Sequence, residues 1–254
     1  MQHQTEYRPV RRRAAALVLA AALFLVTSSA LAQQTNVTRF DTFVGYGFLN
    51  SPHVSLFENG LAFQIGVRPT TWYSLGFDYS LSTGDLTLTP NLLTPKVQTE
   101  LTGLLEFLAA QGKLPPGYAL SLNSHSRTQT FAAGPQLAYR HFQKVTLFVR
   151  PNCGIIKEFA TPKPADPIAT LVVQQLAPSG HKSDWAPFYG FGGGIDFLFG
   201  NHFGLRIQGD LVHDHLFDDL LKDSRWTTRF SVGPIFNYGK NIAKNKKVAK
   251  VTAD

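Results

Sequence analysis

Hydrophobic and polar residues alternate along residues 71–84, which read TWYSLGFDYSLSTG. Starting from Tyr73, every second residue is bulky and apolar: Leu75, Phe77, Tyr79 and Leu81. Most of the residues between them are small or polar: Ser74, Gly76, Asp78, Ser80 and Ser82. A period of two residues is typical of a β-strand with two unlike faces.

The same alternation recurs in seven other segments, so the sequence predicts eight strands in all. These segments are residues 40–49, 61–68, 128–140, 145–155, 188–199, 203–213 and 226–238. Most are close to the roughly 10 residues that a tilted strand needs to cross a bilayer.

The connections between the predicted strands alternate in length. Three are short, around PTT, HFQK and GNH, and four are longer, at residues 50–60, 83–127, 157–187 and 216–224. In an up-and-down barrel, alternate connections lie at the same end, which would gather all short turns at one rim and all long loops at the other. This arrangement is typical of membrane barrels. We therefore predict an all-β fold, an eight-stranded antiparallel up-and-down transmembrane barrel with long extracellular loops.

The bulky face of each strand is predicted to meet lipid, and the small face to fill the lumen. Aromatic residues of the bulky face fall near the two strand ends, as two interfacial girdles would require. Eight strands leave an interior only wide enough for side chains, which suits the many glycines of the small face. The alternative is a soluble, ligand-binding barrel with the bulky face inward. That barrel would need charges on its outer face, whereas the strand charges here share the small face.

Composition agrees with a membrane barrel and argues against a nucleic-acid partner. Charged residues make up 16% of the chain, against about 25% in an average protein. The net charge of +7 lies at the two ends: residues 1–32 hold four arginines and one glutamate, and residues 239–254 hold five lysines and one aspartate. The body of the chain is therefore neutral and offers no basic face to nucleic acid. Its single cysteine, Cys153, cannot form an intrachain disulfide.

Residues 1–32 have the three-part pattern of a cleaved secretory signal peptide. A basic start at Arg11–Arg13 precedes an apolar run at residues 14–26 and a small-residue site, with cleavage predicted between Ala32 and Gln33. The apolar run is short for the roughly 20 residues of a spanning helix, although an uncleaved anchor is the alternative. Residues 33–239 would form the barrel. Residues 240–254 would be a disordered periplasmic tail, with contact to an anionic cell-wall polymer as the alternative.

Four stretches carry a resemblance that covers residues 38–239: DTFVGYGFLN, WYSLGFDYSLSTG, AAGPQLAYRHFQKVTLFVRPNCG and RFSVGPIFNYG. They resemble the OmpA-like eight-stranded outer-membrane barrel superfamily, often labelled outer membrane protein beta-barrel domain. It implies a Gram-negative outer-membrane location and contact with outer-membrane lipid, lipopolysaccharide and the barrel assembly machinery. It also implies an assembly signal at Gly233, Phe236 and Tyr238. The chain departs from that pattern because sixteen residues follow Tyr238.

Charged residues collect on the predicted lumen face. They are Arg68, Asp78, Arg140, Arg150, Asp196, Arg206, Asp210 and Arg229. Charges with little water around them need partners, so we interpret them as a structural plug of salt bridges. A narrow polar channel is the alternative.

Other candidate chemistry is sparse. His213 and His215 share a strand face, which makes a metal site conceivable, but they lie at the predicted rim and we expect no metal or cofactor. A serine–histidine pair of a lipid-modifying enzyme could be drawn from the outer loops, which hold His53, Ser124, His125, Ser126, His181 and Ser183. No spacing singles out a pair, and P-loop, HExxH and CxxC motifs are absent from the sequence. We expect an outer-membrane barrel with a structural or surface-interaction role and no catalytic centre.

Two long loops contain apolar residues at helical spacing. They are Val97, Leu101, Leu104, Leu105 and Leu108 in one loop, and Ile168, Leu171, Val172 and Leu176 in the other. Each predicts a short amphipathic helix that caps the barrel mouth, with a surface-binding platform as the alternative. Three strand prolines, Pro135, Pro151 and Pro234, predict β-bulges because proline lacks the ladder N–H.

Overall fold

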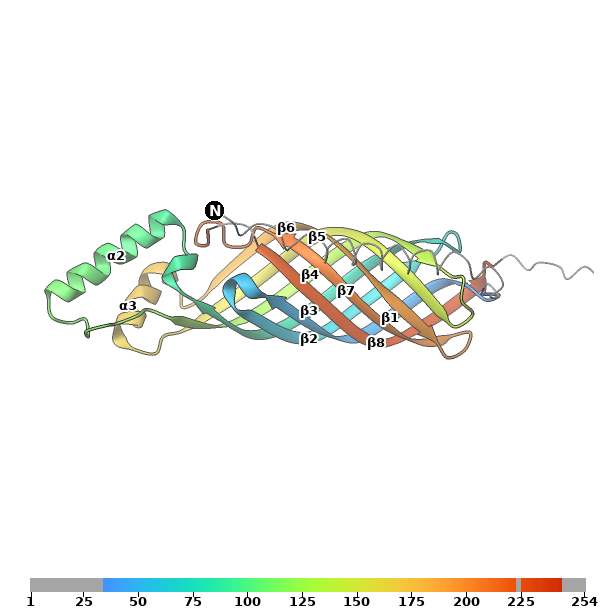
Figure 1. Ribbon diagram of the computed structural model, residues 1–254, viewed down its shortest axis with the longest axis horizontal. Coiled ribbons are helices and arrows are strands. Elements are labelled where there is room, and N and C mark those ends of the chain that lie inside the picture. The colour runs from blue at the N-terminus through green and yellow to red at the C-terminus, as the bar shows by residue number, and fades with distance from the viewer. Residues whose placement is uncertain (1–33, 223–224, 244–254) are drawn as a thin grey trace, which may run out of the picture.

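Eight strands form one closed antiparallel barrel, in which each strand pairs with the next and β8 pairs with β1 (Figure 1). The computed structural model describes residues 34–222 and 225–243. The strands are β1 (Thr38–Ser51), β2 (Leu56–Val67), β3 (Tyr73–Leu88), β4 (Leu122–Tyr139), β5 (Val145–Lys163), β6 (Lys182–Leu198), β7 (Phe203–Asp214) and β8 (Arg225–Asn241). The predicted up-and-down barrel is confirmed. The predicted signal peptide, its cleavage site at Ala32 and Gln33, and residues 244–254 lie outside the described residues.

The two rims of the barrel differ, as the connection lengths predict. Short turns at residues 68–72, 140–144 and 199–202 lie at one rim, which we call the turn end. Residues 52–55, 89–121, 164–181 and 215–222 lie at the other, the loop end. β1 and β8 meet at the turn end, where Thr38 pairs with Asn241. The last strand therefore continues two residues beyond the boundary predicted at Gly239.

Several strands are longer than predicted, so parts of the predicted loops are sheet. β3 and β4 pair out to Leu88 and Leu122, and β5 continues to Lys163. In these extensions the side chains still alternate between the two faces of the sheet. Many of them are Ser, Thr or charged residues, so the hydrophobic pattern that marks a strand is weaker there. The first predicted loop, residues 50–60, is reduced to a tight turn: a 3-10 helix η1 (Pro52–Val54) followed by Ser55 at φ 49°.

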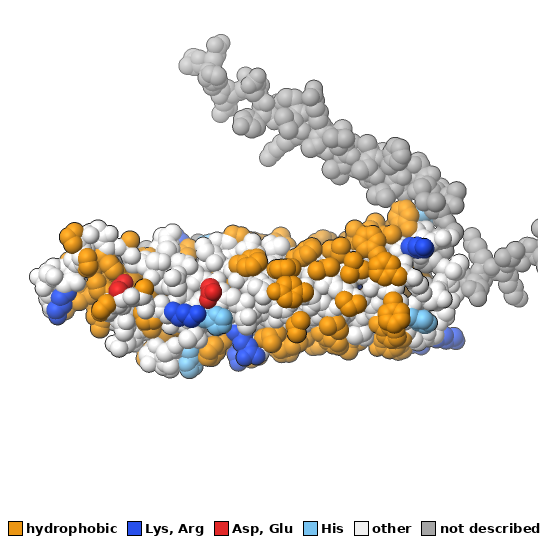
Figure 2. Space-filling view, turned by 90° about the horizontal axis from the view of Figure 1, so that it is seen from below, with side chains coloured by type: hydrophobic (Ala, Val, Ile, Leu, Met, Phe, Trp, Pro, Cys, Tyr) orange, Lys and Arg blue, Asp and Glu red, His pale blue; other side chains and the backbone are white. Residues whose placement is uncertain are grey.

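The strand faces point as predicted. Bulky side chains on all eight strands are exposed on the outside, and they form an apolar belt of Val44, Tyr46, Leu61, Ile65, Leu75, Phe77, Leu137, Tyr139, Val149, Ile155, Tyr189, Phe191, Phe197, Leu211, Phe230 and Phe236. Figure 2 shows hydrophobic side chains gathered along the turn-end side of the barrel, with charged side chains at the boundary toward the loop end. Among the described residues, no helix is both long and apolar enough to cross a membrane.

The prediction of bulges at the strand prolines is wrong. The registers are unchanged across all three prolines: Pro135 pairs with Leu75, Pro151 with Phe191, and Pro234 with Leu205. In the β4–β5 ladder, Pro135 and Pro151 lie opposite each other within a stretch where the pairing is interrupted. The missing N–H groups are thus placed together, and the ladder is interrupted there without the extra residue of a bulge.

Two short helices cover the loop end, α2 (Pro95–Ala110) and α3 (Pro167–Leu176), together with the 3-10 helix η2 (Pro90–Leu92) (Figure 1). Both helices were predicted. Leu101 of α2 and Val172 of α3 belong to one hydrophobic cluster with Leu86 and Val212 of the barrel wall. The helices therefore pack on the mouth as a cap.

Candidate functional site: the charged lumen and its apolar mouth

The lumen is filled by charged side chains arranged in three layers between the turn end and the loop end. The eight residues assigned to the lumen from sequence are all buried there, from 0% exposed for Arg206 to 9% for Arg140. They are Arg68, Asp78, Arg140, Arg150, Asp196, Arg206, Asp210 and Arg229.

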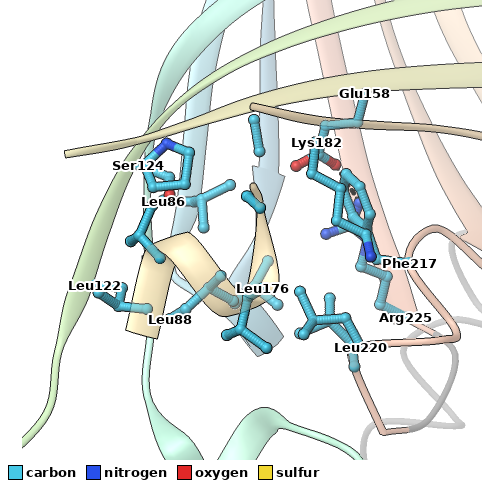
Figure 3. Close-up of a pocket in the computed structure, with 16 residues that line it drawn as sticks. Leu86, Leu88, Leu122, Ser124, Glu158, Leu176, Lys182, Phe217, Leu220 and Arg225 are labelled. Atoms are coloured by element: carbon cyan, nitrogen blue, oxygen red, sulfur yellow. Dashed lines mark hydrogen bonds and ion pairs between the residues drawn. The ribbon is translucent and has the colours of Figure 1, made fainter. Parts of the chain in front are cut away.

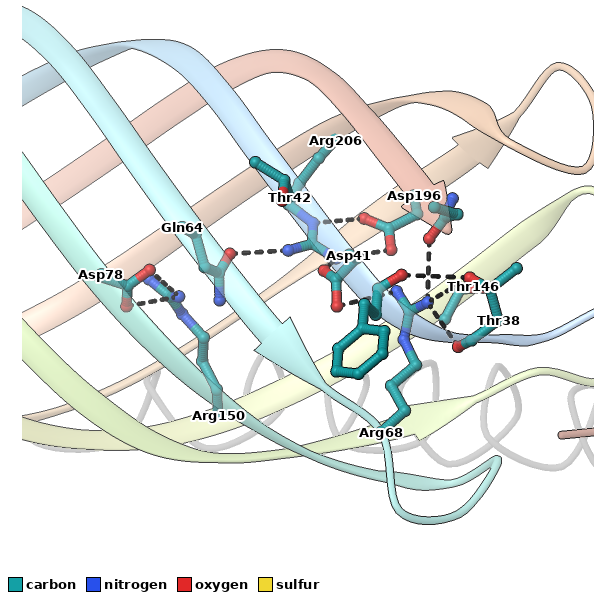
Figure 4. Close-up of polar contacts among 12 residues, drawn as sticks. Thr38, Asp41, Thr42, Gln64, Arg68, Asp78, Thr146, Arg150, Asp196 and Arg206 are labelled. Atoms are coloured by element: carbon teal, nitrogen blue, oxygen red, sulfur yellow. Dashed lines mark hydrogen bonds and ion pairs between the residues drawn. The ribbon is translucent and has the colours of Figure 1, made fainter. Parts of the chain in front are cut away.

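Arg206 is the centre of the layer nearest the turn end (Figure 4). Its Nε lies 2.7 Å from Asp196 Oδ1, and its Nη2 lies 3.2 Å from Asp41 Oδ2. Its Nη1 donates to Gln64 Oε1 at 2.6 Å. The guanidinium also lies 4.8 Å from the ring centroid of Phe148. Arg206 is thus held on several sides by groups that suit a desolvated cation.

Two further arginines complete this layer. Arg68 Nη2 lies 3.2 Å from Asp41 Oδ1, and Arg68 Nη1 donates to Asn237 Oδ1 at 2.9 Å. Arg140 donates from Nη1 to Thr146 Oγ1 at 3.0 Å and from Nε to the backbone oxygen of Thr71 at 2.9 Å. Asp41 therefore belongs to the charge network, although it is absent from the set of lumen charges predicted from the sequence.

The middle layer is centred on Arg150, whose side chain bridges opposite walls of the barrel, and we call this bridge the crossbar. Its Nη1 donates to both carboxylate oxygens of Asp78, at 2.9 and 2.8 Å. From the opposite side, its Nε and Nη2 donate to Asp210 at 2.9 and 2.6 Å. Arg229 Nη2 also lies 3.1 Å from Asp210 Oδ2. Two guanidinium groups and two carboxylates therefore join β3, β5, β7 and β8 across the lumen.

The layer nearest the loop end is richer in carboxylates. Arg225 pairs with Glu158 and, at 2.9 Å, with Asp214. Ser126 donates to Glu158 at 3.2 Å. Glu58 is 0% exposed, and neither of its carboxylate oxygens accepts a hydrogen bond within the described part of the chain. Three carboxylates thus face one arginine in this layer.

Sequence reasoning missed Glu58, Glu158, Asp214 and Arg225. Glu58 and Glu158 fall in stretches predicted as loops, whereas both lie on strands. The signal that could have found them is the continued period of two: Arg225 has the same parity as Arg229 on β8, and Glu158 has the same parity as Arg150 on β5.

Above these layers, the mouth of the barrel is apolar (Figure 3). Leu86 and Leu122 of the wall, Leu176 of α3 and Phe217 and Leu220 of the last loop surround a cavity of about 40 Å³. Glu158 and Arg225 lie at its edge. A cavity of this size is far smaller than the roughly 150 Å³ that holds a benzene molecule. The apolar side chains therefore leave little free space at the mouth.

The cap is fixed by a polar contact between its two loops. Asp166 is the N-cap of α3, and its Oδ1 accepts from the backbone N–H of Ala169 at 2.8 Å. The hydroxyl of Tyr118 donates to the same carboxylate at 3.0 Å. The Ala169 N–H, together with the Tyr118 hydroxyl, lowers the pKa of Asp166. Partial burial and the adjacent carboxylate raise the pKa of Tyr118 to about 12.

The serines and histidines considered for a catalytic pair do not form one. Ser124 and Ser126 are buried in the lumen, whereas His125 between them points outward and lies 3.3 Å from Asp85. His181 stacks on Phe159, with ring centroids 4.8 Å apart.

His213 and His215 lie on the outer side of the barrel among aromatic rings. Their ring centroids are 5.1 Å apart, and His213 stacks on Tyr189 at 5.1 Å. His215 Nδ1 lies 3.3 Å from Asp218. In the part of the chain that the structure describes, no cluster of three or more His, Cys, Asp or Glu side chains is placed to hold a metal ion.

The three residues of the implied assembly signal lie on β8. Phe236 and Tyr238 face outward and stack with their ring centroids 5.6 Å apart. Gly233 faces the lumen, where a Cβ atom would lie 2.2 Å from the backbone oxygen of Val44. Only glycine therefore permits the close approach of β1 and β8 at this point.

No protein-family model and no curated protein matches the chain. Solved structures of similar shape include Neisserial surface protein A, at TM-score 0.48 and 7% identity over 78% of this chain and 96% of that one. Ail of Yersinia pestis, bound to a heparin analogue, gives a TM-score of 0.45 and 11% identity, covering 80% of this chain and 99% of Ail. The β-barrel domain of Pseudomonas aeruginosa OprF gives 0.39 and 11%, covering 79% and 98%. At these scores, no conclusion about function follows from the likeness.

Proposed function

We propose that this chain is an integral outer-membrane barrel whose closed lumen is a structural plug and whose loop end is a surface for interactions. The observation that carries the proposal is the division of the strand faces. Bulky apolar side chains such as Phe77, at 48% exposed, surround the outside, while thirteen charged side chains of the described residues are buried within. Apolar exposure on this scale is unfavourable in water and suits a bilayer.

The orientation follows from the two rims. In outer-membrane barrels the short turns face the periplasm and the long loops face outward. The cap of α2 and α3 would then lie at the cell surface, and the tail after Asn241 would emerge in the periplasm. A catalytic role has no support in the arrangement of the described serines and histidines.

A conducting channel fits this lumen less well than a plug. Arg150 bonds to Asp78 and Asp210 on opposite walls, and Leu86 and Phe217 close the mouth above. Water and ions would pass only after these contacts broke. A sealed lumen contributes stability to the wall, since each charge layer joins strands that are not neighbours in the sheet.

The test combines two measurements: insertion of the protein into the outer membrane and its ion conductance in planar bilayers. The mature chain should fractionate with outer membranes and migrate differently on gels before and after boiling, because closed barrels resist detergent. In planar bilayers the folded protein should give no discrete conductance steps. Arg150→Ala, which removes the crossbar, is the matched variant and should leak more than the natural chain.

Three results would replace this proposal. A soluble, heat-insensitive protein would refute the membrane barrel. Discrete steps from the natural chain would favour the narrow channel. A change in the mass of lipid A that depends on the protein would favour a lipid-modifying enzyme.

A further inference from the structure

A basic and aromatic patch lies on the outside of the barrel at the loop-end edge of the apolar belt. It consists of Arg127 on β4, Lys157 and Phe159 on β5, and Trp185 on β6, and we call it the rim patch. Lys157 follows Ile155, a belt residue that is 49% exposed, by two positions on the same face. The patch therefore begins where the apolar surface ends.

The sheet register brings the two cations together. Arg127 pairs with Phe159, and Lys157 pairs with Trp185 on its other side. Arg127 and Lys157 are thus diagonal neighbours on one face, roughly 7–8 Å apart at Cα. Both side chains are long enough to meet at one anionic group between them.

In the structure the Lys157 ammonium leans over Trp185 on β6, on the side of β5 away from Arg127 on β4. Lys157 Nζ lies 4.7 Å from the ring centroid of Trp185, which is 52% exposed. An exposed cation–π contact of this kind is weak, so the Lys157 side chain can turn back toward Arg127 when an anion binds between them. Phe159 fills the space beside Arg127 and stacks on His181.

The nearest outward-facing carboxylate by register is that of Asp85 on β3, diagonal to Arg127, and it lies 3.3 Å from His125. Among the described residues, no carboxylate lies within ion-pair distance of Arg127 or Lys157, whereas Lys163 lies 3.7 Å from Asp85 and Lys182 is paired with Asp219. In the loop-end halves of the described strands, outward-facing lysine and arginine side chains occur only on β4 and β5. The positive charge thus lies on one side of the barrel.

We propose that the rim patch binds the phosphate group of a glycolipid in the outer leaflet, a phosphorylated lipid of the lipopolysaccharide type. Arg127 and Lys157 would bind the phosphate through charge-assisted hydrogen bonds, and Trp185 would lie at the boundary between headgroup and acyl chains. The acyl chains would continue over Ile155 and the apolar belt. This inference rests on the proposed outer-membrane function and specifies which lipid group the barrel recognises and where.

The test measures binding of purified lipopolysaccharide to the folded full-length protein in lipopolysaccharide-free nanodiscs. Arg127→Gln/Lys157→Gln should weaken binding by about tenfold or more, since two charge-assisted contacts are lost. Arg39→Gln/Lys240→Gln removes two exposed positive charges at the turn end and should leave binding unchanged. Enzymatically dephosphorylated lipopolysaccharide should bind weakly to all three proteins.

A charge-preserving swap separates charge from shape. Arg127→Lys/Lys157→Arg should keep most of the affinity that the glutamine variant loses. The inference is overturned if the glutamine variant binds like the natural chain, if the turn-end control loses as much, or if dephosphorylated lipid binds equally well. Heat-modifiable migration of every variant distinguishes these outcomes from a failure of the membrane-barrel proposal, which would abolish that migration in the natural chain too.

Discussion

Arg206 and Asp196 face each other across the β6–β7 ladder and form a bidentate ion pair inside the barrel, with N–O distances of 2.7 and 2.9 Å. Neither side chain is more than 1% exposed. A buried pair of this kind need not stabilise a fold more than apolar packing would, but the loss of one partner leaves an unpaired charge. The stability of the barrel therefore depends on each buried lumen charge keeping its partner.

Arg206→Met should destabilise the barrel by about 3–5 kcal/mol, because Asp196 and Asp41 would lose a buried cation. The free energy of unfolding in urea, measured on the refolded protein in detergent, checks this. Lys240→Met, which removes an exposed charge from the same turn end, is the control. Equal stability of the two variants would show that the lumen charges are not coupled in the way the contacts indicate.

The two glutamates of the loop-end layer should respond in opposite directions. Glu58→Gln removes a buried charge without an ion-pair partner and should raise stability by an amount on the order of 1 kcal/mol. Glu158→Gln weakens the ion pair with Arg225 and should cost about 1–3 kcal/mol. Thermal unfolding of both variants at one pH gives the comparison. A loss of stability in both would mean that Glu58 has a charged partner.

Charge on the outer face should be costly. Phe77 lies on β3 with Ile65 and Ala133 as its cross-strand neighbours, and it is 48% exposed. Phe77→Arg should cost about 2–4 kcal/mol if this position lies near the bilayer midplane. Phe77→Leu is the control and should fold normally into vesicles. Equal folding yields of the two variants would contradict a lipid-facing position.

The cap should loosen in acid. Asp166 has a lowered pKa in the folded state, so its contribution is present above its ordinary pKa and is lost as the pH falls through the lowered value. The protection factor of the Ala169 amide, the factor by which it exchanges more slowly than in an unfolded chain at the same pH, should therefore fall as the pH falls through that value. Asp166→Asn should remove this pH dependence while keeping an acceptor oxygen. Identical exchange profiles of the two proteins would contradict the N-cap role.

Much of the fold could be predicted because the strand faces differ so strongly. Phe77 beside Asp78, or Ile207 beside Gln208, identifies both the strand and its inward face. Loop helices were also predictable, since α2 and α3 carry apolar residues at helical spacing. The pairing of neighbours follows from the alternating lengths of the connections.

The strand ends and the arrangement of the prolines could not be predicted, because both depend on which residues of neighbouring strands lie opposite each other. Glu58 and Glu158 lie where strands extend beyond the apolar belt, and each has a phenylalanine on only one side. Asn59 and Lys157 on the other sides interrupt the apolar alternation that marks a strand. The bulge prediction failed because it considered each proline alone. Pro135 and Pro151 lie opposite each other, and the ladder omits their bonds at one place without changing register.

The central claim is that the outer face of the barrel contacts acyl chains, and the single cysteine tests it directly. Cys153 lies on β5 facing outward within the apolar belt, beside Ala133 and Tyr189. A small fluorophore attached to Cys153 of the folded protein in vesicles should be quenched strongly by brominated acyl chains and weakly by aqueous iodide. Strong quenching by iodide, with no effect of the brominated lipid, would contradict the membrane barrel.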